Sequence, residues 1–301
     1  MSEYSSADQL PWNHRNYRPL IINVALTGTI PKKDDHARLP VTPEEIAEEV
    51  RRCAMLGAHV FHLHMRNSSG QPTQDRKLFE ETILSIRATT PSVMLCVTTS
   101  SRASGSFRER LTPLLLSGNA IPDLASLSLG SFNFPASISE NSPSEIDQLA
   151  QAMSELDIKP ELEVFEPGML GTAHTLRKRG LLTGKFVVNI LLGNKGTSAA
   201  TAQALTPFLS QLPQDTEWAL AGIGRFQRKA MMLGIALGGN IRIGMEDDPA
   251  GDGSGSWSNE KAVELAVSMA GLAGRSLATI DEARRRLLDQ PNQESVISSN
   301  H

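Results

Sequence analysis

Val60-Phe61-His62-Leu63-His64-Met65-Arg66 alternates strictly between the two faces of an extended strand. Phe61 and Leu63 share one face, and His62 and His64 share the other. Two neutral imidazoles two residues apart can reach a single ion, because imidazole is a common ligand of zinc and similar metals. A hydrogen-bonded pair of histidines at a strand end would explain the same pattern. The stretch therefore predicts a buried strand and leaves its metal site as one of two interpretations.

The same alternation of strand and helix recurs along the chain. Residues 19–26 form a nearly continuous apolar run, as a strand buried on both faces should. Thr42, Pro43 and Glu45 then supply a capping residue, a proline at the first helical position and a glutamate three residues after the cap. Seven more such units follow, with predicted strands at 59–64, 92–98, 124–129, 161–165, 186–192, 217–221 and 240–245, and predicted helices at 76–89, 107–117, 143–157, 169–179, 199–212, 227–237 and 259–274.

Eight strand–helix units in about 260 residues predict an α/β fold, a closed (β/α)8 TIM barrel. An open doubly wound sheet is the alternative, but no G-x-G-x-x-G follows the first strand. Residues 277–284 predict one further capped helix lying across the barrel. We expect a single domain spanning residues 1–301, with a polar N-terminal arm at 1–18 and a polar tail at 290–301.

Composition narrows the possible partners. The 301 residues are 40% hydrophobic, and 29 basic against 33 acidic residues give a net charge of −4. This balance argues against nucleic acid or an anionic membrane as the main partner. No apolar run approaches the roughly 18 residues needed to span a membrane, and the N-terminus has no apolar signal core. The two cysteines, Cys53 and Cys96, lie in unlike contexts and predict no disulfide, so we expect a cytoplasmic protein.

Barrel geometry indicates where the chemistry should lie. Reacting groups in such barrels sit at the carboxyl ends of the strands. His62 and His64 end the second strand, and Glu246 ends the eighth, which closes the barrel beside the first. Two histidines and one carboxylate with open positions are typical of a catalytic metal site. A salt bridge from Glu246 to a loop lysine is the alternative.

Arg242 and Asp247 form a second candidate pair on the eighth strand. A barrel-facing arginine must have a partner, and Asp247 can serve directly or through Thr98 or Thr99 of the third strand. A purely structural ion pair and a catalytic pair fit this spacing equally. In the catalytic interpretation, Arg242 polarises a carbonyl group and Asp247 acts as a base.

Further polar groups follow strands three to eight. Glu161, Glu163 and Glu166 belong to or follow the fifth strand, where Glu163 could orient water, a histidine or substrate, and Ser126 on the fourth offers a hydroxyl. The loop 98–106 carries Arg102 among hydroxyl groups and suits an anion. The loop 192–198 could bind a phosphate through backbone N–H groups or be an ordinary flexible loop. The glycine-rich stretch 247–258 predicts a mobile lid.

With these residues placed, the sequence resembles the beta-keto acid cleavage enzyme family over residues 19 to 290. The resemblance rests on six segments that together are specific: LTG at 26–28, LPVTPEE at 39–45, GAHVFHLH at 57–64, PELEVFE at 160–166, AGIGR at 221–225 and GNIRIGMED at 239–247.

The resemblance implies a zinc-dependent TIM barrel, usually a homotetramer. Such enzymes convert a β-keto acid and acetyl-CoA to acetoacetate and a new CoA thioester by a retro-Claisen route. By position, the implied metal ligands are His62, His64 and Glu246, the implied catalytic residues are Arg242, Asp247 and Thr98, and the implied substrate contacts include Glu163 and Ser126.

Two departures from a family representative with an amino-bearing substrate concern the substrate pocket. Ile30 stands where that enzyme has a glutamate, and Ser100-Ser101-Arg102 stands where it has Gly-Gly-Ala. An anion is lost and a cation is gained. We therefore expect a neutral or anionic keto acid side chain, with Ile30, Thr99 and Arg102 near it.

Two other classes fit the same pattern. A CoA-independent metal-dependent hydrolase or aldolase can carry His-x-His at a strand end, and product formation without acetyl-CoA would indicate it. A non-catalytic binding protein that kept the barrel would show no turnover.

Overall fold

The computed structural model describes residues 17–103, 106–135 and 137–289. Within them, eight parallel strands close into a barrel in the order β1-β12-β11-β10-β9-β6-β5-β2. The predicted (β/α)8 TIM barrel is confirmed. The barrel strands are β1 Ile22–Ala25, β2 Val60–Leu63, β5 Met94–Val97, β6 Leu124–Ser128, β9 Lys159–Val164, β10 Val187–Leu192, β11 Glu217–Gly222 and β12 Asn240–Ile243. Most of the predicted terminal arm and the whole predicted tail lie outside the described residues.

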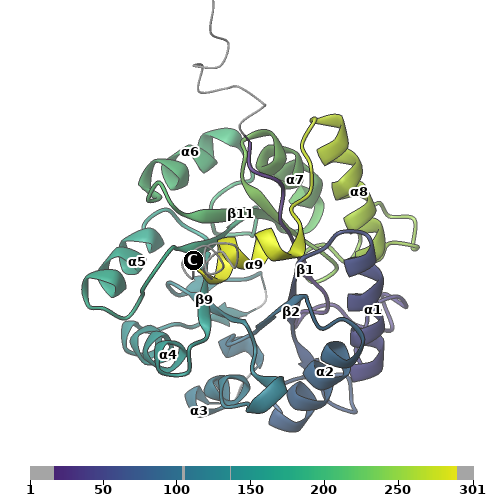
Figure 1. Ribbon diagram of the computed structural model, residues 1–301, viewed down its shortest axis with the longest axis horizontal. Helices are drawn as coiled ribbons and strands as arrows, with labels where there is room; N and C mark the ends of the chain where they lie inside the picture. The colour runs from purple at the N-terminus through teal and green to yellow at the C-terminus, as the bar shows by residue number, and fades with distance from the viewer. Residues whose placement is uncertain (1–16, 104–105, 136, 290–301) are drawn as a thin grey trace, which may run out of the picture.

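Helices surround the barrel and alternate with its strands (Figure 1). The first begins as predicted, because Thr42 and Glu45 form a capping box around Pro43. Ser142 and Glu145 repeat this device before the fourth helix. The helices are α1 Pro43–Met55, α2 Arg76–Thr89, α3 Phe107–Leu111, α4 Pro143–Glu155, α5 Met169–Lys178, α6 Ala202–Gln211, α7 Gln227–Ala236, α8 Asn259–Leu272 and α9 Ile280–Leu288.

The alternation in β2 separates two cores. Phe61 and Leu63 pack in the large apolar layer between barrel and helices. Val60 packs in the smaller core of the barrel interior, together with Met94 and Cys96 of β5. Since His62 shares the face of Val60, its side chain belongs to the interior.

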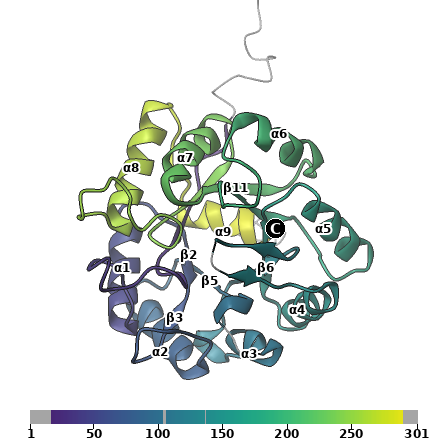
Figure 2. The same ribbon diagram turned by 180° about the vertical axis from the view of Figure 1, so that it is seen from behind.

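One end of the barrel is closed by α9, which crosses the middle of the view in Figure 1. Arg286 donates to Glu217 at the start of β11 at 2.7 Å, and Arg284 donates to Asp123 before β6 at 2.9 Å. Both carboxylates lie at the amino ends of strands. The predicted extra helix is therefore confirmed as a plug, and the carboxyl ends of the strands open on the opposite face, seen in Figure 2.

Several boundaries differ from the prediction, and three of these differences have clear local reasons. The predicted helix 107–117 is helical in α3 only to Leu111, and a 3-10 turn continues it, since Pro113 lacks an amide donor. The predicted strand 240–245 ends at Ile243 because Gly244 takes a φ of +134°. The helix predicted at 277–284 begins at Ile280, after Thr279 as cap.

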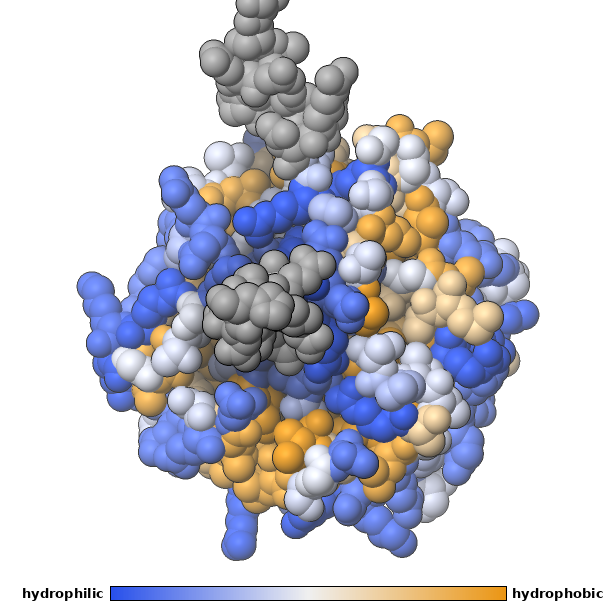
Figure 3. Space-filling view, in the orientation of Figure 1, coloured by the Kyte–Doolittle hydropathy of each residue, from blue (hydrophilic) through white to orange (hydrophobic). Residues whose placement is uncertain are grey.

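The surface beside α9 is largely hydrophilic, and apolar side chains gather over the side carrying α8 and α1 (Figure 3). Leu272 of α8 is 91% exposed and Met55 of α1 is 75% exposed. An exposed apolar region of this kind is typical of a protein interface. Among the described residues, no helix has both the length and the apolar character needed to cross a membrane.

Candidate active site

A cavity of about 340 Å³ opens at the carboxyl ends of the strands. Nine of the eleven predicted site residues line it: Ile30, His62, His64, Thr98, Arg102, Glu163, Arg242, Glu246 and Asp247. Thr99 and Ser126 lie just outside this lining, where the Thr99 hydroxyl donates to the Ser126 carbonyl oxygen at 2.6 Å. These two buried residues join the neighbouring ends of β5 and β6.

His62, His64 and Glu246 converge on one point of this cavity. Their nearest donor atoms are the two Nε2 atoms, 3.2 Å apart, and Glu246 Oε1, 3.9 Å from His62 Nε2 and 3.5 Å from His64 Nε2. Ligands placed tetrahedrally about one zinc ion lie about 3.3 Å apart. The three residues form a group whose ligand atoms all lie within 4.8 Å of one another.

The electrostatics of this group suit a cation. Burial holds the pKa of His62 well below its usual value, against the opposing effect of Glu246, so its imidazole is neutral. Burial raises the pKa of Glu246, but His64, His62 and Arg242 together hold it well below its ordinary range. Glu246 Oε2 is buried without a hydrogen-bond partner among the described residues. Two imidazoles and a buried carboxylate therefore fit a divalent metal ion.

Two glycines let Glu246 approach the histidines across β1. A side chain at Gly244 would place its Cβ 2.2 Å from the Ala25 carbonyl oxygen, and a side chain at Gly28 would place it 2.6 Å from Glu246 Cγ. The backbone N–H of Glu246 donates to the same Ala25 oxygen at 3.1 Å. The chain after β12 thus crosses the end of β1 toward β2, as the predicted neighbourhood of these strands requires.

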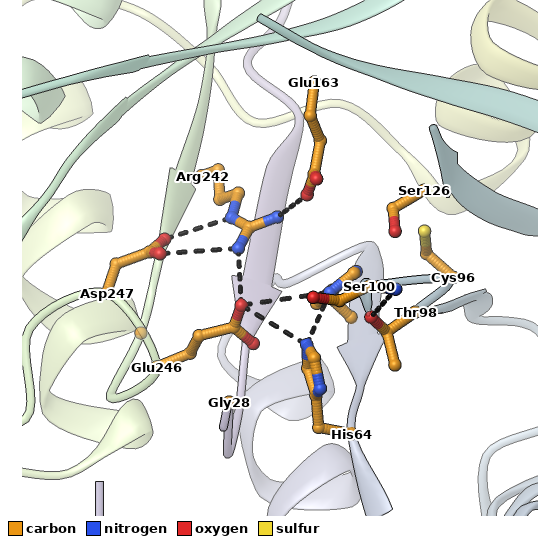
Figure 4. Close-up of polar contacts among 12 residues, drawn as sticks. Gly28, His64, Cys96, Thr98, Ser100, Ser126, Glu163, Arg242, Glu246 and Asp247 are labelled. Atoms are coloured by element: carbon orange, nitrogen blue, oxygen red, sulfur yellow. Dashed lines mark hydrogen bonds and ion pairs between the residues drawn. The ribbon is translucent and has the colours of Figure 1, made fainter. Parts of the chain in front are cut away.

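Arg242 lies among three carboxylates, shown in Figure 4. Its Nη1 donates to Glu163 at 3.0 Å, its Nη2 to Glu246 at 2.8 Å, and its Nε to Asp247 at 3.0 Å. The predicted direct contact with Asp247 is therefore present, and the partner of Glu246 is this arginine rather than a loop lysine. One fixed guanidinium orients all three carboxylates toward the cavity.

Asp247 has the properties of a base. Burial raises its pKa to about 6, Arg242 opposes this shift, and Glu246 adds to it. Its carboxylate is therefore ionised at neutral pH and can still accept a proton. A base of this pKa is well matched to general acid–base chemistry near neutral pH.

Glu161 has a different environment from Glu163, although both belong to β9. It lies inside the barrel, accepting from Asn23 Nδ2 at 2.7 Å and from Cys96 Sγ at 3.3 Å. Burial raises its pKa to about 7, with Arg242 opposing. Glu163 instead lines the cavity and accepts from Ser128 at 2.9 Å. The interior role of Cys96 was not predicted, because its apolar neighbours identify only a buried strand.

An aromatic wall was also missed. Phe132 and Phe165 stack with ring centroids 3.7 Å apart, Phe134 lies 5.1 Å from Phe132, and all three line the cavity. Phe132 and Phe134 belong to a hairpin of β7 Phe132–Asn133 and β8 Ile138–Ser139. The alternating aromatic residues after β6 were the available signal.

The three loops that the sequence indicated, 98–106, 192–198 and 247–258, all contribute residues to the cavity. Arg102 from the loop after β5 lines the cavity, as do Asn194 and Lys195 from the loop after β10 and Pro249 from the loop after β12. Burial lowers the pKa of Arg102, while Glu246 acts in the opposite direction. A phosphate contact at 192–198 and a mobile lid at 247–258 stay predictions.

The closed barrel and the polar cavity at the carboxyl ends of its strands define a (β/α)8-barrel enzyme. The chain belongs to the beta-keto acid cleavage enzyme family, whose sequence model matches residues 19–288. The predicted membership is confirmed, and the chain is a β-keto acid cleavage enzyme.

Two relatives extend over nearly the whole chain. The 3-keto-5-aminohexanoate cleavage enzyme of Fusobacterium nucleatum subsp. nucleatum is 35% identical over 270 residues, covering 89% of this chain and 97% of its own. The 3-oxoadipate:acetyl-CoA acetyltransferase of Cupriavidus necator is 34% identical over 281 residues, covering 92% of this chain and 97% of its own. The solved apo structure of ObcA has a TM-score of 0.73 at 21% identity, covering 83% of this chain and 65% of that chain, and supports the fold alone.

Proposed function

We propose that this enzyme converts a β-keto acid and acetyl-CoA to acetoacetate and a new CoA thioester by a retro-Claisen route. The observation that carries the proposal is the meeting, in one cavity, of a three-donor cluster and an ionised base. His62, His64 and Glu246 form the cluster. Asp247 lies beside it and accepts a hydrogen bond from Arg242. Relatives named for acetyl-CoA-dependent transfer support the choice of cosubstrate.

His62, His64 and Glu246 would hold the metal, which we propose to be Zn²⁺. Their donor set of two imidazoles and one carboxylate suits zinc and leaves positions open for substrate. When bound, the ion supplies Lewis acidity to the keto and carboxylate oxygens of the substrate.

The protein side chains supply the proton transfers. Asp247 removes a proton from the carbon between the keto and carboxylate groups, and this carbon attacks the thioester carbonyl of acetyl-CoA. The CoA thiolate leaves and then adds to the original keto carbon. The bond between that carbon and the former methylene carbon breaks, releasing acetoacetate after Asp247 returns the proton. The acetyl group thus moves to the substrate's methylene carbon, CoA takes the remaining acyl group, and the proton that Asp247 removed returns to acetoacetate.

Arg242 and Thr98 orient these steps. Arg242 contacts Asp247 and Glu246 and so fixes the base beside the donor cluster. The Thr98 oxygen accepts from Ser100 N at 3.1 Å, which aligns its hydroxyl at the cavity wall, where its proton can reach a developing oxyanion. We propose that Glu163 contacts the substrate, and that Thr99 and Ser126, which do not line the cavity, support the residues that do.

The keto acid side chain is proposed to be neutral or anionic. Ile30 lies at the cavity mouth, 59% exposed, and offers no charge to an ammonium group. Arg102 on the same cavity would repel one. A clear turnover preference for amino- or trimethylammonium-bearing keto acids would contradict this part of the proposal.

Assays with and without acetyl-CoA test the reaction class. The proposal predicts acetoacetate and a new CoA thioester in equal amounts, and no product from the keto acid when acetyl-CoA is omitted. Turnover that does not require acetyl-CoA would instead identify the alternative, a CoA-independent metal-dependent hydrolase or aldolase.

We also propose a homotetramer in the cytoplasm. The exposed apolar side chains of α8 and α1 support an assembly of copies through this side of the barrel. Light scattering coupled to gel filtration measures the number of chains, and a monomer would contradict the proposal.

A further inference from the structure

Among the predicted charged site residues, Arg102 is the one that forms no ion pair with another described residue. It belongs to the 3-10 turn Ser101–Ala103 after β5 and lines the cavity. Its guanidinium carbon lies 3.7 Å above the centre of the Phe134 ring. The aromatic wall therefore supports one face of the guanidinium and fixes its orientation.

Two of the three nitrogens of this guanidinium are buried and unpaired. Nε and Nη1 have no hydrogen-bond partner, and Arg102 forms no ion pair within residues 17–103, 106–135 and 137–289. The nearby carboxylates of Glu163 and Asp247 are engaged by Arg242 instead. Burying a charged donor without a partner is costly, so this geometry is that of a group that awaits an anion.

We propose that Arg102 binds a second acidic group at the far end of the keto acid, so that the substrate is a β-keto dicarboxylate. This inference rests on the proposed function and narrows its neutral or anionic side chain to an anionic one. The carboxylate that is β to the keto group faces the cluster of His62, His64 and Glu246. The second carboxylate, at the far end of the substrate, forms a charge-assisted pair with Arg102. Arg102 is then the residue that sets specificity.

A phosphate of acetyl-CoA is the other anion that could reach this arginine. The two anions predict different kinetic effects of replacing Arg102. A pair with the keto acid affects only diacids, whereas a pair with a CoA phosphate affects every keto acid and appears in the KM for acetyl-CoA.

The test compares 3-oxoadipate with its distal methyl ester, which has nearly the same shape and lacks the distal charge. Wild-type enzyme should favour the diacid by about 10- to 100-fold in kcat/KM, the range for one charge-assisted bond. Arg102→Gln should reduce this preference at least tenfold, and Arg102→Lys should restore part of it because a cation returns. Arg108→Gln, an exposed arginine on α3 outside the cavity, is the matched control and should keep the wild-type preference.

Calorimetric titration of the metal-loaded enzyme with 3-oxoadipate and with the ester gives a second readout that does not require turnover. The proposal predicts a tighter Kd for the diacid in wild type and a loss of this difference in Arg102→Gln. Equal losses for diacid and ester, or an increase confined to the KM for acetyl-CoA, would overturn it. Absence of acetyl transfer to any keto acid would refute the proposed function, while the titration would still decide the role of Arg102.

Discussion

Replacing Asp247 by asparagine should separate the base from the metal site. Asparagine keeps the shape of Asp247 and can still accept from Arg242 Nε, now 3.0 Å from Oδ2. Arg242 keeps its contacts with Glu163 at 3.0 Å and Glu246 at 2.8 Å. We therefore expect the fold and the donor cluster of His62, His64 and Glu246 to survive the change.

The expected loss of rate follows from the lost proton acceptor. General base catalysis contributes about 10²- to 10⁴-fold, or about 2.7 to 5.4 kcal/mol of barrier. Asp247→Asn should lose this factor in kcat, as measured by acetoacetate release, with one metal ion per chain retained by elemental analysis. More than a tenth of wild-type activity would refute the assignment of the base, and loss of the metal would refute the separation of the two roles.

The pH profile provides the matched control. Burial raises the pKa of Asp247 to about 6, against Arg242, and the base is active only as a carboxylate. Wild-type kcat/KM should therefore be constant above about pH 6 and fall tenfold per unit below it. The residual activity of Asp247→Asn should lack this fall, and a variant with the wild-type profile would place the titrating group elsewhere.

Three further changes test the site and the fold. Glu246→Gln should lower metal content and activity together, because it removes the charged donor of the cluster; full activity would exclude Glu246 as a ligand. Gly28→Ala should destabilise the protein by more than the roughly 1–2 kcal/mol of left-handed strain and should weaken metal binding, since its Cβ would meet Glu246 Cγ at 2.6 Å. Gly180→Ala, at a φ of +73° with open space, should show only the strain, and equal effects on metal binding would contradict the contact. Burial raises the pKa of Glu49, with Arg52 opposing, so the folded state binds its proton more tightly and loses stability as pH rises through that pKa. Glu49→Gln should therefore raise Tm more at pH 7.5 than at pH 4.5, and the reverse order in thermal melts would contradict the sign.

The barrel was predictable because its signals are local. Capping residues such as Thr42 start the helices where expected, and the barrel strands carry buried apolar residues on the face that packs against the helices. The convergence of His62, His64 and Glu246 followed from two rules: active residues lie at strand ends, and the first strand neighbours the last. Both rules act at the level of the fold and need no side-chain coordinates.

The other half of the cavity depends on contacts that no spacing specifies. The stack of Arg102 on Phe134 joins the loop after β5 to the hairpin after β6. The sequence of neither segment predicts this contact. Ser126 was expected to contact substrate because of its hydroxyl and the family resemblance, but it is buried beside Thr99 and does not line the cavity. Strand register gives the direction of a side chain, while loop packing decides whether it reaches the cavity.

Carbon labelling tests the central claim most directly. Acetyl-CoA carrying ¹³C at its carbonyl carbon is incubated with the metal-loaded enzyme and an unlabelled β-keto acid, and the products are followed by carbon NMR. The retro-Claisen route predicts acetoacetate labelled at its keto carbon, with the new CoA thioester unlabelled, because the acetyl group moves to the methylene carbon of the substrate. Unlabelled acetoacetate, or label retained in the thioester, would contradict the account.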